Sequence, residues 1–488
     1  MLPIDQNDTV NDALLSALQG NILKGHGRDR TANIFLEFHP DQIKAARIWI
    51  AEFADTMVTS AKEQLAQNER FKRHKVSGGL FAGLYISAAG YQFLQVAPEL
   101  QPDVADSSFG RGMRHADLND PEIDCWEPTF GKLQIHVMVL LAHDEKLALS
   151  KAVAELIAKV RPLTIETNLP PDHIDHFLSK KIGIEYGTAI RNANGDGLEH
   201  FGYVDGISQP LFFKDEVEQD CKERVPDTRE QAWNPQAELG LVLAPDYANA
   251  QTHGSFFVFR KLEQNVRAFK LAERILASEL CLKGEDAELA GAMLVGRFED
   301  GTPVTVTNHP GMIGSGNANN FNYANDQQGL KCPVHGHVRK TNPRGAGFPG
   351  TSANDDKLHM MARRGIPYGQ RDVSTEFDCQ PEQFPDGGGV GLLFQSFQGS
   401  LENQFEFIQK NWVNNTDFPP VETGQQVAGI DPLIGQGPTG SKRTNAWPAT
   451  WGSETTKVLS FPAMVTMKGG EYFFAPSLTM LRSLADHV

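Results

Sequence analysis

The segment Gln134-Ile-His-Val-Met-Val-Leu-Leu141 decides how the first half of this chain is read. Its valines, isoleucine and leucines favour a buried β-strand. Only five residues later, the stretch from Lys146 to Val160 carries leucine, valine and isoleucine at helical spacing on one face. It predicts an amphipathic helix that packs on a sheet. A strand followed directly by such a helix indicates an α+β or α/β fold.

The same alternation extends outward from this segment along the chain. In the first half we expect helices at Asn11–Leu23 and Ile43–Phe53, and strands at Asn33–Phe38 and Leu80–Ser87. In the second half we expect strands at Ser255–Phe259, His359–Arg363 and Val390–Phe397, and helices at Val266–Leu280, Glu285–Arg297 and Glu402–Trp412. Val458–Ser477 reads as a hairpin that turns at Lys468–Glu471. Thr423–Thr450, rich in Gly, Thr and Pro, reads as a long surface loop.

Each half therefore follows the order strand, helix, two strands, helix, strand. This is the order of the split βαβ, or ferredoxin-like, unit. The 488 residues are also too many for one small core. We expect an α+β protein of two duplicated ferredoxin-like domains, residues 1–225 and 226–488, whose antiparallel sheets carry peripheral helices.

Composition excludes several classes of protein. The net charge of -16 argues against a nucleic-acid-binding protein, which needs a basic face. The N-terminus shows no signal-peptide pattern and the chain has no apolar run of ~18 residues, so we expect no membrane span and a cytoplasmic location. The five cysteines are scattered without a CxxC or CxxCH motif, which argues against a disulfide framework, a zinc knuckle and covalent haem attachment.

The segment Cys332–Arg344 concentrates basic side chains in this acidic chain. It places His337 among three cations, including Arg339, and contains no acidic residue. A neutral imidazole beside fixed cations suits haem, because the imidazole binds iron and the cations pair with the propionates. His335 and His337 also form an HxH pair, but further zinc or copper ligands at the usual spacing are missing. A plain basic loop also explains this segment when it is taken alone.

Two other stretches contain polar residues that could complete such a site. Arg363 and Arg364 end an apolar strand pattern, so they should point to opposite faces. No acidic residue lies within six positions of either one, and an inward guanidinium would need an anionic ligand or a distant carboxylate. Asp205 precedes Gly206 among aromatic and β-branched residues. Asp-Gly is a common turn, but a carboxylate in an apolar pocket can also accept and return a proton.

Together these stretches resemble the signature of the dye-decolorising peroxidases. The family's GxxDG motif appears as Gly202–Gly206, its proximal histidine motif as Cys332–Arg344, and its distal arginine motif as Arg363–Gly369. Family-like stretches elsewhere spread the resemblance over most of the chain: Gln19–Leu23, Gly254–Leu262, Gly391–Phe394, Gln404–Gln409 and Phe474–Ser477. The length points to the larger, advanced class. The resemblance also implies the duplicated ferredoxin-like fold, with haem bound mainly in the C-terminal half.

The resemblance implies a role for individual residues. His337 aligns as the axial ligand of the iron, whereas His335 is expected to be structural. Asp205 aligns as the distal acid and base, Arg363 as the distal arginine, and Arg339 is expected to contact a propionate. The implied cofactor is one non-covalent haem b per chain. Leu392–Phe394 is expected in the distal wall.

Other features of the implied site are left open. An acidic partner of the axial histidine is expected, with Glu402 and Glu406 as candidates. Bulky donors cannot enter a small peroxide channel, so their electrons would pass through surface aromatic residues. The candidates are Trp412, Trp447, Trp451 and Tyr323. Simple packing is the alternative role for each of them.

The implied activity is the reduction of hydrogen peroxide with one-electron oxidation of bulky aromatic donors such as dyes and phenolics. The physiological reductant, manganese included, is left open, as is the choice between monomer and homo-oligomer. A haem-binding or haem-handling protein with little turnover is the alternative, and a haem-free interaction protein is a third reading. Asp205 and Arg363 favour the peroxidase, because simple binding needs neither.

Overall fold

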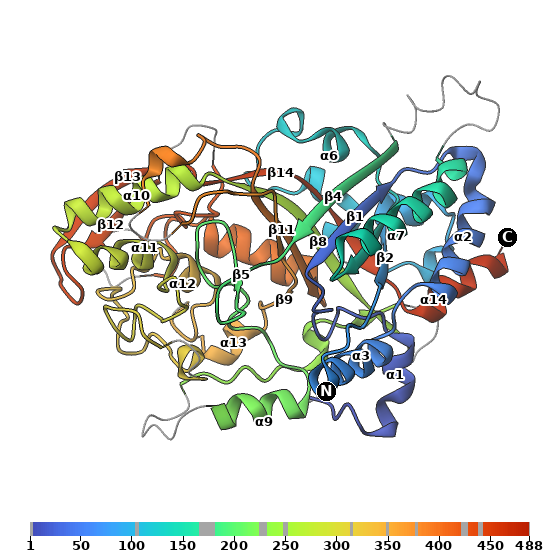
Figure 1. Ribbon diagram of the computed structural model, residues 1–488, viewed down its shortest axis with the longest axis horizontal. Helices are drawn as coiled ribbons and strands as arrows, with labels where there is room; N and C mark the ends of the chain where they lie inside the picture. The colour runs from blue at the N-terminus through green and yellow to red at the C-terminus, as the bar shows by residue number, and fades with distance from the viewer. Residues whose placement is uncertain are drawn as a thin grey trace.

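The computed structural model describes residues 3–102, 107–164, 181–223, 232–246, 252–312, 316–347, 351–375, 379–420, 428–437 and 443–487. Within these residues, ten strands form one sheet in which every strand pair is antiparallel, with the order β10-β11-β8-β14-β2-β3-β1-β4 along its main path. Helices flank this sheet on both sides in Figure 1. The expectation of an α+β protein with an antiparallel sheet is confirmed.

The first half supplies four neighbouring strands: β1 (Arg30–Leu36), β2 (Phe81–Ser87), β3 (Val137–His143) and β4 (Ile182–Thr188). Their helices are α1 (Asp12–Ala17), α2 (Ile43–Thr56), α3 (Ala61–His74), α4 (Ala88–Phe93), α5 (Ser107–Arg111), α6 (Pro128–Lys132) and α7 (Lys146–Val160). The apolar stripe of α7 is buried as its spacing predicts. The expected N-terminal helix is shorter than predicted, because Leu18 adopts an extended conformation and ends α1.

The second half supplies the other strands of the sheet: β7 (Ala244–Pro245), β8 (His253–Gln264), β9 (Ala362–Arg363), β10 (Ile366–Tyr368), β11 (Gly391–Gln398) and β14 (Val465–Ala475). Its helices are α10 (Val266–Glu279), α11 (Glu288–Val295), α12 (His337–Thr341), α13 (Ala353–Lys357) and α14 (Leu478–Ser483), whereas α9 (Lys214–Glu223) lies at the end of the first half. Two π-helical segments, η11 (Leu401–Glu406) and η12 (Ile408–Val413), stand where an ordinary helix is expected. Two short ribbons lie outside the sheet: β5 (Ile190–Arg191) with β6 (Gly197–Leu198), and β12 (Arg443–Pro448) with β13 (Thr456–Phe461).

The two halves meet where β14 pairs with β2, through Phe473 opposite Ser87 and Phe474 opposite Ile86. The sheet also curls over itself. The ring centroids of Phe35 on β1 and Phe259 on β8 lie 4.9 Å apart although several strands separate them in the sheet. Such aromatic pairs contribute about 0.5–1.5 kcal/mol beyond the burial of their area. The aromatic core therefore ties both halves into one body.

Two expectations for the C-terminal region are wrong. β14 runs through Lys468–Glu471 as one strand, with a bulge between Met467 and Gly469, and the strand before it pairs with β12 instead. A Cβ on Gly469 would lie 2.4 Å from Cβ of Phe130, and its φ is 134°. This glycine therefore serves a bulge and a close approach and does not form a turn.

The expected surface loop at Thr423–Thr450 is also wrong where the structure describes it. Its residues 443–448 form β12, and within 428–437 Ala428, Asp431 and Leu433 are buried.

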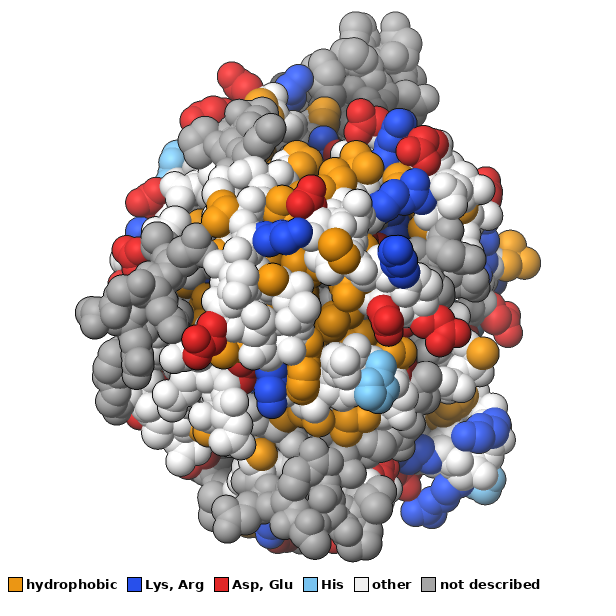
Figure 2. Space-filling view, turned by 90° about the vertical axis from the view of Figure 1, so that its left-hand side faces the viewer, with side chains coloured by type: hydrophobic (Ala, Val, Ile, Leu, Met, Phe, Trp, Pro, Cys, Tyr) orange, Lys and Arg blue, Asp and Glu red, His pale blue; other side chains and the backbone are white. Residues whose placement is uncertain are grey.

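Figure 2 shows the face that carries α10, β12 and β13, where hydrophobic side chains reach the surface among charged ones.

Candidate active site

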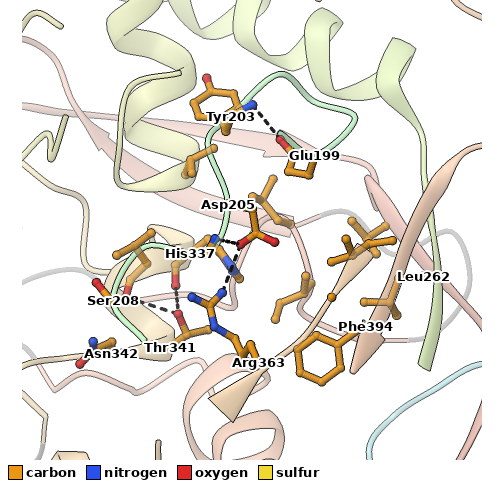
Figure 3. Close-up of a pocket in the computed structure, with 18 of the residues that line it drawn as sticks. Glu199, Tyr203, Asp205, Ser208, Leu262, His337, Thr341, Asn342, Arg363 and Phe394 are labelled. Carbon is orange, nitrogen blue, oxygen red and sulfur yellow. Dashed lines mark hydrogen bonds and ion pairs between the residues drawn. The ribbon is translucent and has the colours of Figure 1, made fainter. Parts of the chain in front are cut away.

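A cavity of about 260 Å³ brings the three sequence motifs together (Figure 3). Asp205 comes from the loop after β6, His337 from the first position of α12, and Arg363 from the end of β9. Much of the remaining lining is apolar and includes Leu262, Leu392, Phe394, Phe405, Ile408 and Leu433. Of the stretch Leu392–Phe394 expected in an apolar wall, Leu392 and Phe394 line the cavity and Leu393 does not.

His337 is oriented by a buried carboxylate. Its Nδ1 lies 2.7 Å from Oδ2 of Asp431, which is fully buried. Oδ1 of Asp431 accepts hydrogen bonds from the amides of Leu433 (2.8 Å) and Ile434 (3.1 Å). Burial alone would raise the pKa of Asp431, but His337 and the two amides outweigh it and hold this pKa below its usual value. An ionised Asp431 fixes the proton of a neutral imidazole on Nδ1, which leaves the lone pair of Nε2 for a ligand in the cavity.

The acidic partner of His337 is Asp431, and neither of the two candidates, Glu402 and Glu406, contacts this histidine. Glu406 instead accepts hydrogen bonds from Tyr472, Arg111 and Lys410. Glu402 is exposed on η11. Sequence reasoning missed Asp431 because it lies 94 positions after His337, in a stretch without periodicity.

Asp205 and Arg363 form a second polar pair on the cavity wall. Their Oδ1 and Nη1 atoms lie 3.4 Å apart, and about a third of each side chain is exposed into the open space (Figure 3). Arg363 is held by the carbonyl of Ile207, which accepts from its Nη2 at 2.8 Å. The amide of Gly206 donates to Oδ1 of Asp205 at 2.6 Å, and its φ of 86° suits a glycine. The pair combines a carboxylate that can take a proton with a cation that keeps its own.

The two adjacent arginines do point apart, as the strand pattern predicts. Arg364 turns away from Arg363, and its guanidinium donates to the carbonyls of Asn21 and Ile22 at 2.7 and 2.9 Å. His335 is buried and makes an edge contact with Trp447, at 4.3 Å between ring centroids. Its placement agrees with a structural role.

The placement of Arg339 does not fit the contact expected from the sequence. Its guanidinium is buried, donates to Oδ2 of Asp326 (3.2 Å) and the carbonyl of Cys332 (2.8 Å), and lies over the ring of Tyr323. Because α12 is helical, a residue two positions after His337 points to the other side of the helix.

Arg297 is a cation that the sequence analysis missed and that does line the cavity. It donates to the carbonyls of Gly301 and Ala318, both at 2.8 Å, and to Oγ of Ser208 at 3.2 Å. Burial lowers its pKa to about 10. None of the described carboxylates forms an ion pair with it, so an anionic group in the cavity would compensate its buried charge.

The aromatic residues expected to pass electrons at the surface lie mostly inside. Trp412, Trp447 and Tyr323 are buried, and only Trp451 is partly exposed. No disulfide joins cysteines among the described residues.

These features fit a haem. The protein would offer one imidazole whose second nitrogen is held by a carboxylate, apolar walls for a macrocycle, and a buried cation for a propionate. In the described part of the chain, no three His, Cys, Asp or Glu side chains converge as metal ligands. Nor does any described helix have the length and apolar character needed to cross a membrane.

Comparisons with known proteins identify the family. No family model matches the chain. The multifunctional dye peroxidase DyP2 of Amycolatopsis sp. (strain ATCC 39116 / 75iv2) is 42% identical, over 99% of this chain and all of the relative. The dye-decolorizing peroxidase msp1 of Mycetinis scorodonius is 28% identical, over 96% of this chain and 87% of the relative.

Solved structures of similar fold belong to the same family. The structure of DyP2 from Amycolatopsis sp. ATCC 39116 matches with a TM-score of 0.86 and 40% identity, and covers 99% of both chains. A DyP-type peroxidase of Anabaena sp. matches with a TM-score of 0.83 and 37% identity, over 99% of this chain and 97% of the other. The chain belongs to the family of DyP-type dye-decolorising peroxidases, which bind haem. It is an oxidoreductase that acts on peroxide.

Proposed function

We propose that His337, Asp205 and Arg363 are the reactive residues of a peroxidase that holds one non-covalent haem b per chain in the cavity that they line. The observation that carries this proposal is the meeting of two polar pairs on one apolar cavity, His337 with Asp431 and Asp205 with Arg363. Bound haem supplies the redox-active iron at which the O–O bond of peroxide is broken. Nε2 of His337 would bind the iron, and the C-terminal half, which supplies most of the lining, would hold most of the haem.

Asp205 moves the proton of the reaction. Its carboxylate accepts a proton from one oxygen of the peroxide and returns it to the other, directly or through one water. Arg363 keeps its proton and stabilises the negative charge that develops on the peroxide oxygens. Because a carboxylate remains a base in acid where an imidazole does not, turnover with bulky donors should peak on the acid side of neutrality.

Arg297 is the better candidate for a propionate contact. It is buried on the cavity wall and has no carboxylate partner among the described residues. Arg339 would instead stabilise α12 through its ion pair with Asp326, on the side of the helix away from the cavity. The reductants are aromatic donors, in line with the dye peroxidases among the relatives.

The presence of Asp205 and Arg363 favours this function over haem binding without turnover. The test is an optical spectrum of the haem-replete protein before and after one equivalent of hydrogen peroxide, followed by stopped flow. We expect a rapid spectral change in the wild type. Asp205→Asn should slow this change while haem stays bound, and the exposed control Asp117→Asn should not affect it. A haem spectrum that ignores peroxide would instead support the haem-handling alternative.

We infer in addition that the two halves of the chain are copies of one split βαβ unit. Within each half the strands stand in the order second, third, first, fourth: β2-β3-β1-β4 and β10-β11-β8-β14. This is the order that the ferredoxin-like unit produces. The boundary between 1–225 and 226–488 lies outside the described residues. Expression of each half alone, with circular dichroism to detect folding, tests the division.

A further inference from the structure

A second cavity, of about 360 Å³, lies beside α4 and α5, away from the three motifs. Arg111, Arg114 and His115 supply cationic or ionisable groups to its wall, and Gln92 and Gln134 supply amides. Glu471 is the one carboxylate among its described lining residues. Burial raises the pKa of Glu471, and its Oε1 accepts from the amides of Met113 (3.0 Å) and Tyr472 (2.8 Å). With three basic side chains and one carboxylate, the described lining suits an anionic ligand.

A short chain of contacts joins this cavity to the first one. Nη2 of Arg111, on the wall of the second cavity, lies 3.0 Å from Oε2 of Glu406. The hydroxyl of Tyr472 donates to Oε1 of Glu406 at 2.9 Å. The ring of Tyr472 meets the edge of Phe405 at 6.0 Å between centroids, and Phe405 lines the first cavity.

Tyr472 and Glu406 have the chemistry of a redox-active pair. Burial opposes ionisation of Glu406, but hydrogen bonds and charge from Lys410, together with Tyr472, hold its pKa below the usual value. Burial and the charge of Glu406 raise the pKa of Tyr472, so the phenol is neutral. A neutral phenol that already donates to a carboxylate can lose an electron and a proton together. By contrast, the indole N–H groups of Trp412 and Trp447 have no acceptor among the described residues.

We propose that the second cavity binds anionic aromatic donors and that Tyr472 passes their electrons to the haem cavity. This rests on the proposed function, since peroxide is the oxidant. Tyr472 gives one electron to the peroxide-oxidised centre while its hydroxyl proton moves to Oε1 of Glu406. The donor then gives one electron to the tyrosyl radical, and the proton returns from Glu406. Two donor molecules are oxidised for each peroxide reduced to water.

Dye binding tests the cavity without any turnover. A sulfonated azo dye is dialysed against the ferric, haem-loaded protein without peroxide, so that haem fills the first cavity. Gln92→Glu with Gln134→Glu places two negative charges on the wall at exposed positions and should weaken binding on the order of fivefold. Gln328→Glu with Gln370→Glu, both exposed and outside the lining, is the charge-matched control and should change nothing. Equal dissociation constants for the variant with charges on the wall and for the wild type would overturn the binding site.

Freeze-quenched electron paramagnetic resonance after peroxide addition tests the relay. The wild type should give a tyrosyl signal that Tyr472→Phe removes. Tyr91→Phe, another buried tyrosine change, should keep it. Tyr203, which lines the first cavity, is the rival, because its hydroxyl donates to Oε1 of Glu273 at 2.7 Å. A signal that persists in Tyr472→Phe and disappears in Tyr203→Phe would overturn the relay. These two negative results can be told apart from an error in the proposed function. In that case the haem spectrum of the wild type would not respond to peroxide.

Discussion

Replacing Asp431 with asparagine should raise the reduction potential of bound haem. The asparagine keeps the shape of the side chain, and its carbonyl oxygen can still accept the amides of Leu433 and Ile434, but its NH2 group then faces Nδ1–H of His337 and cannot accept that proton. It removes the negative charge 2.7 Å from Nδ1 of His337. That charge makes the imidazole a stronger donor and stabilises the ferric over the ferrous iron.

The size of the shift follows from the hydrogen bond. A partner that orients a metal-bound histidine changes metal affinity by roughly 10–100-fold, and each tenfold is about 59 mV for one electron. If the whole effect falls on the ferric form, the midpoint should rise by roughly 60–120 mV.

Spectroelectrochemical titration of the haem-loaded protein measures this midpoint. Glu402→Gln, which removes the charge of an exposed glutamate first considered for the same role, is the control. Its midpoint should equal that of the wild type. A shift below about 20 mV for Asp431→Asn, equivalent to no more than a twofold change, would refute the reasoning that Asp431 tunes the axial ligand.

Three further outcomes are expected. Asp205→Asn and Arg363→Leu should each slow the reaction with peroxide by about 10²–10⁴-fold in stopped flow while the Soret band stays; an unchanged rate would exclude that residue. Arg297→Ala should weaken haem binding in a titration of apo-protein by on the order of tenfold, because it loses a charge-assisted hydrogen bond; equal affinity would exclude a propionate contact. His136 is buried, and its pKa falls to about 4 through burial. The unfolded chain therefore binds more protons between pH 6.5 and about 4, and stability should fall by up to about 3 kcal/mol as the pH drops through that window. His136→Asn should flatten this dependence in urea unfolding; an equal slope would contradict it.

Regular elements were predictable from the sequence where one periodicity dominates. The helix at Lys146–Val160 has the predicted bounds, because its apolar residues keep one helical face over four turns. The glycines at 469 and 470 misled the prediction for β14, since a turn and a bulge use the same residue type. Only the close approach of Phe130, 339 positions earlier, distinguishes them.

The site was predictable to the extent that its motifs are contiguous. Asp205, His337 and Arg363 line one cavity, as their motifs imply. Asp431 and Arg297 were not predictable, because each belongs to the site through long-range packing. Asp431 stands in no periodic or motif-like stretch, and Arg297 ends a predicted helix whose pattern says nothing about the site. Arg339 is the opposite case. It lies near His337 in the sequence, but its side chain is on the far side of a short helix and contacts Asp326.

The central claim is that Nε2 of His337 binds the haem iron. It is tested most directly by the optical and electron paramagnetic resonance spectra of ferric His337→Gly, recorded with and without imidazole. We predict that the variant loses the histidine-ligated spectrum and its response to peroxide, and that added imidazole restores both. A variant that keeps the wild-type Soret band and reacts with peroxide at the wild-type rate without imidazole would contradict the claim.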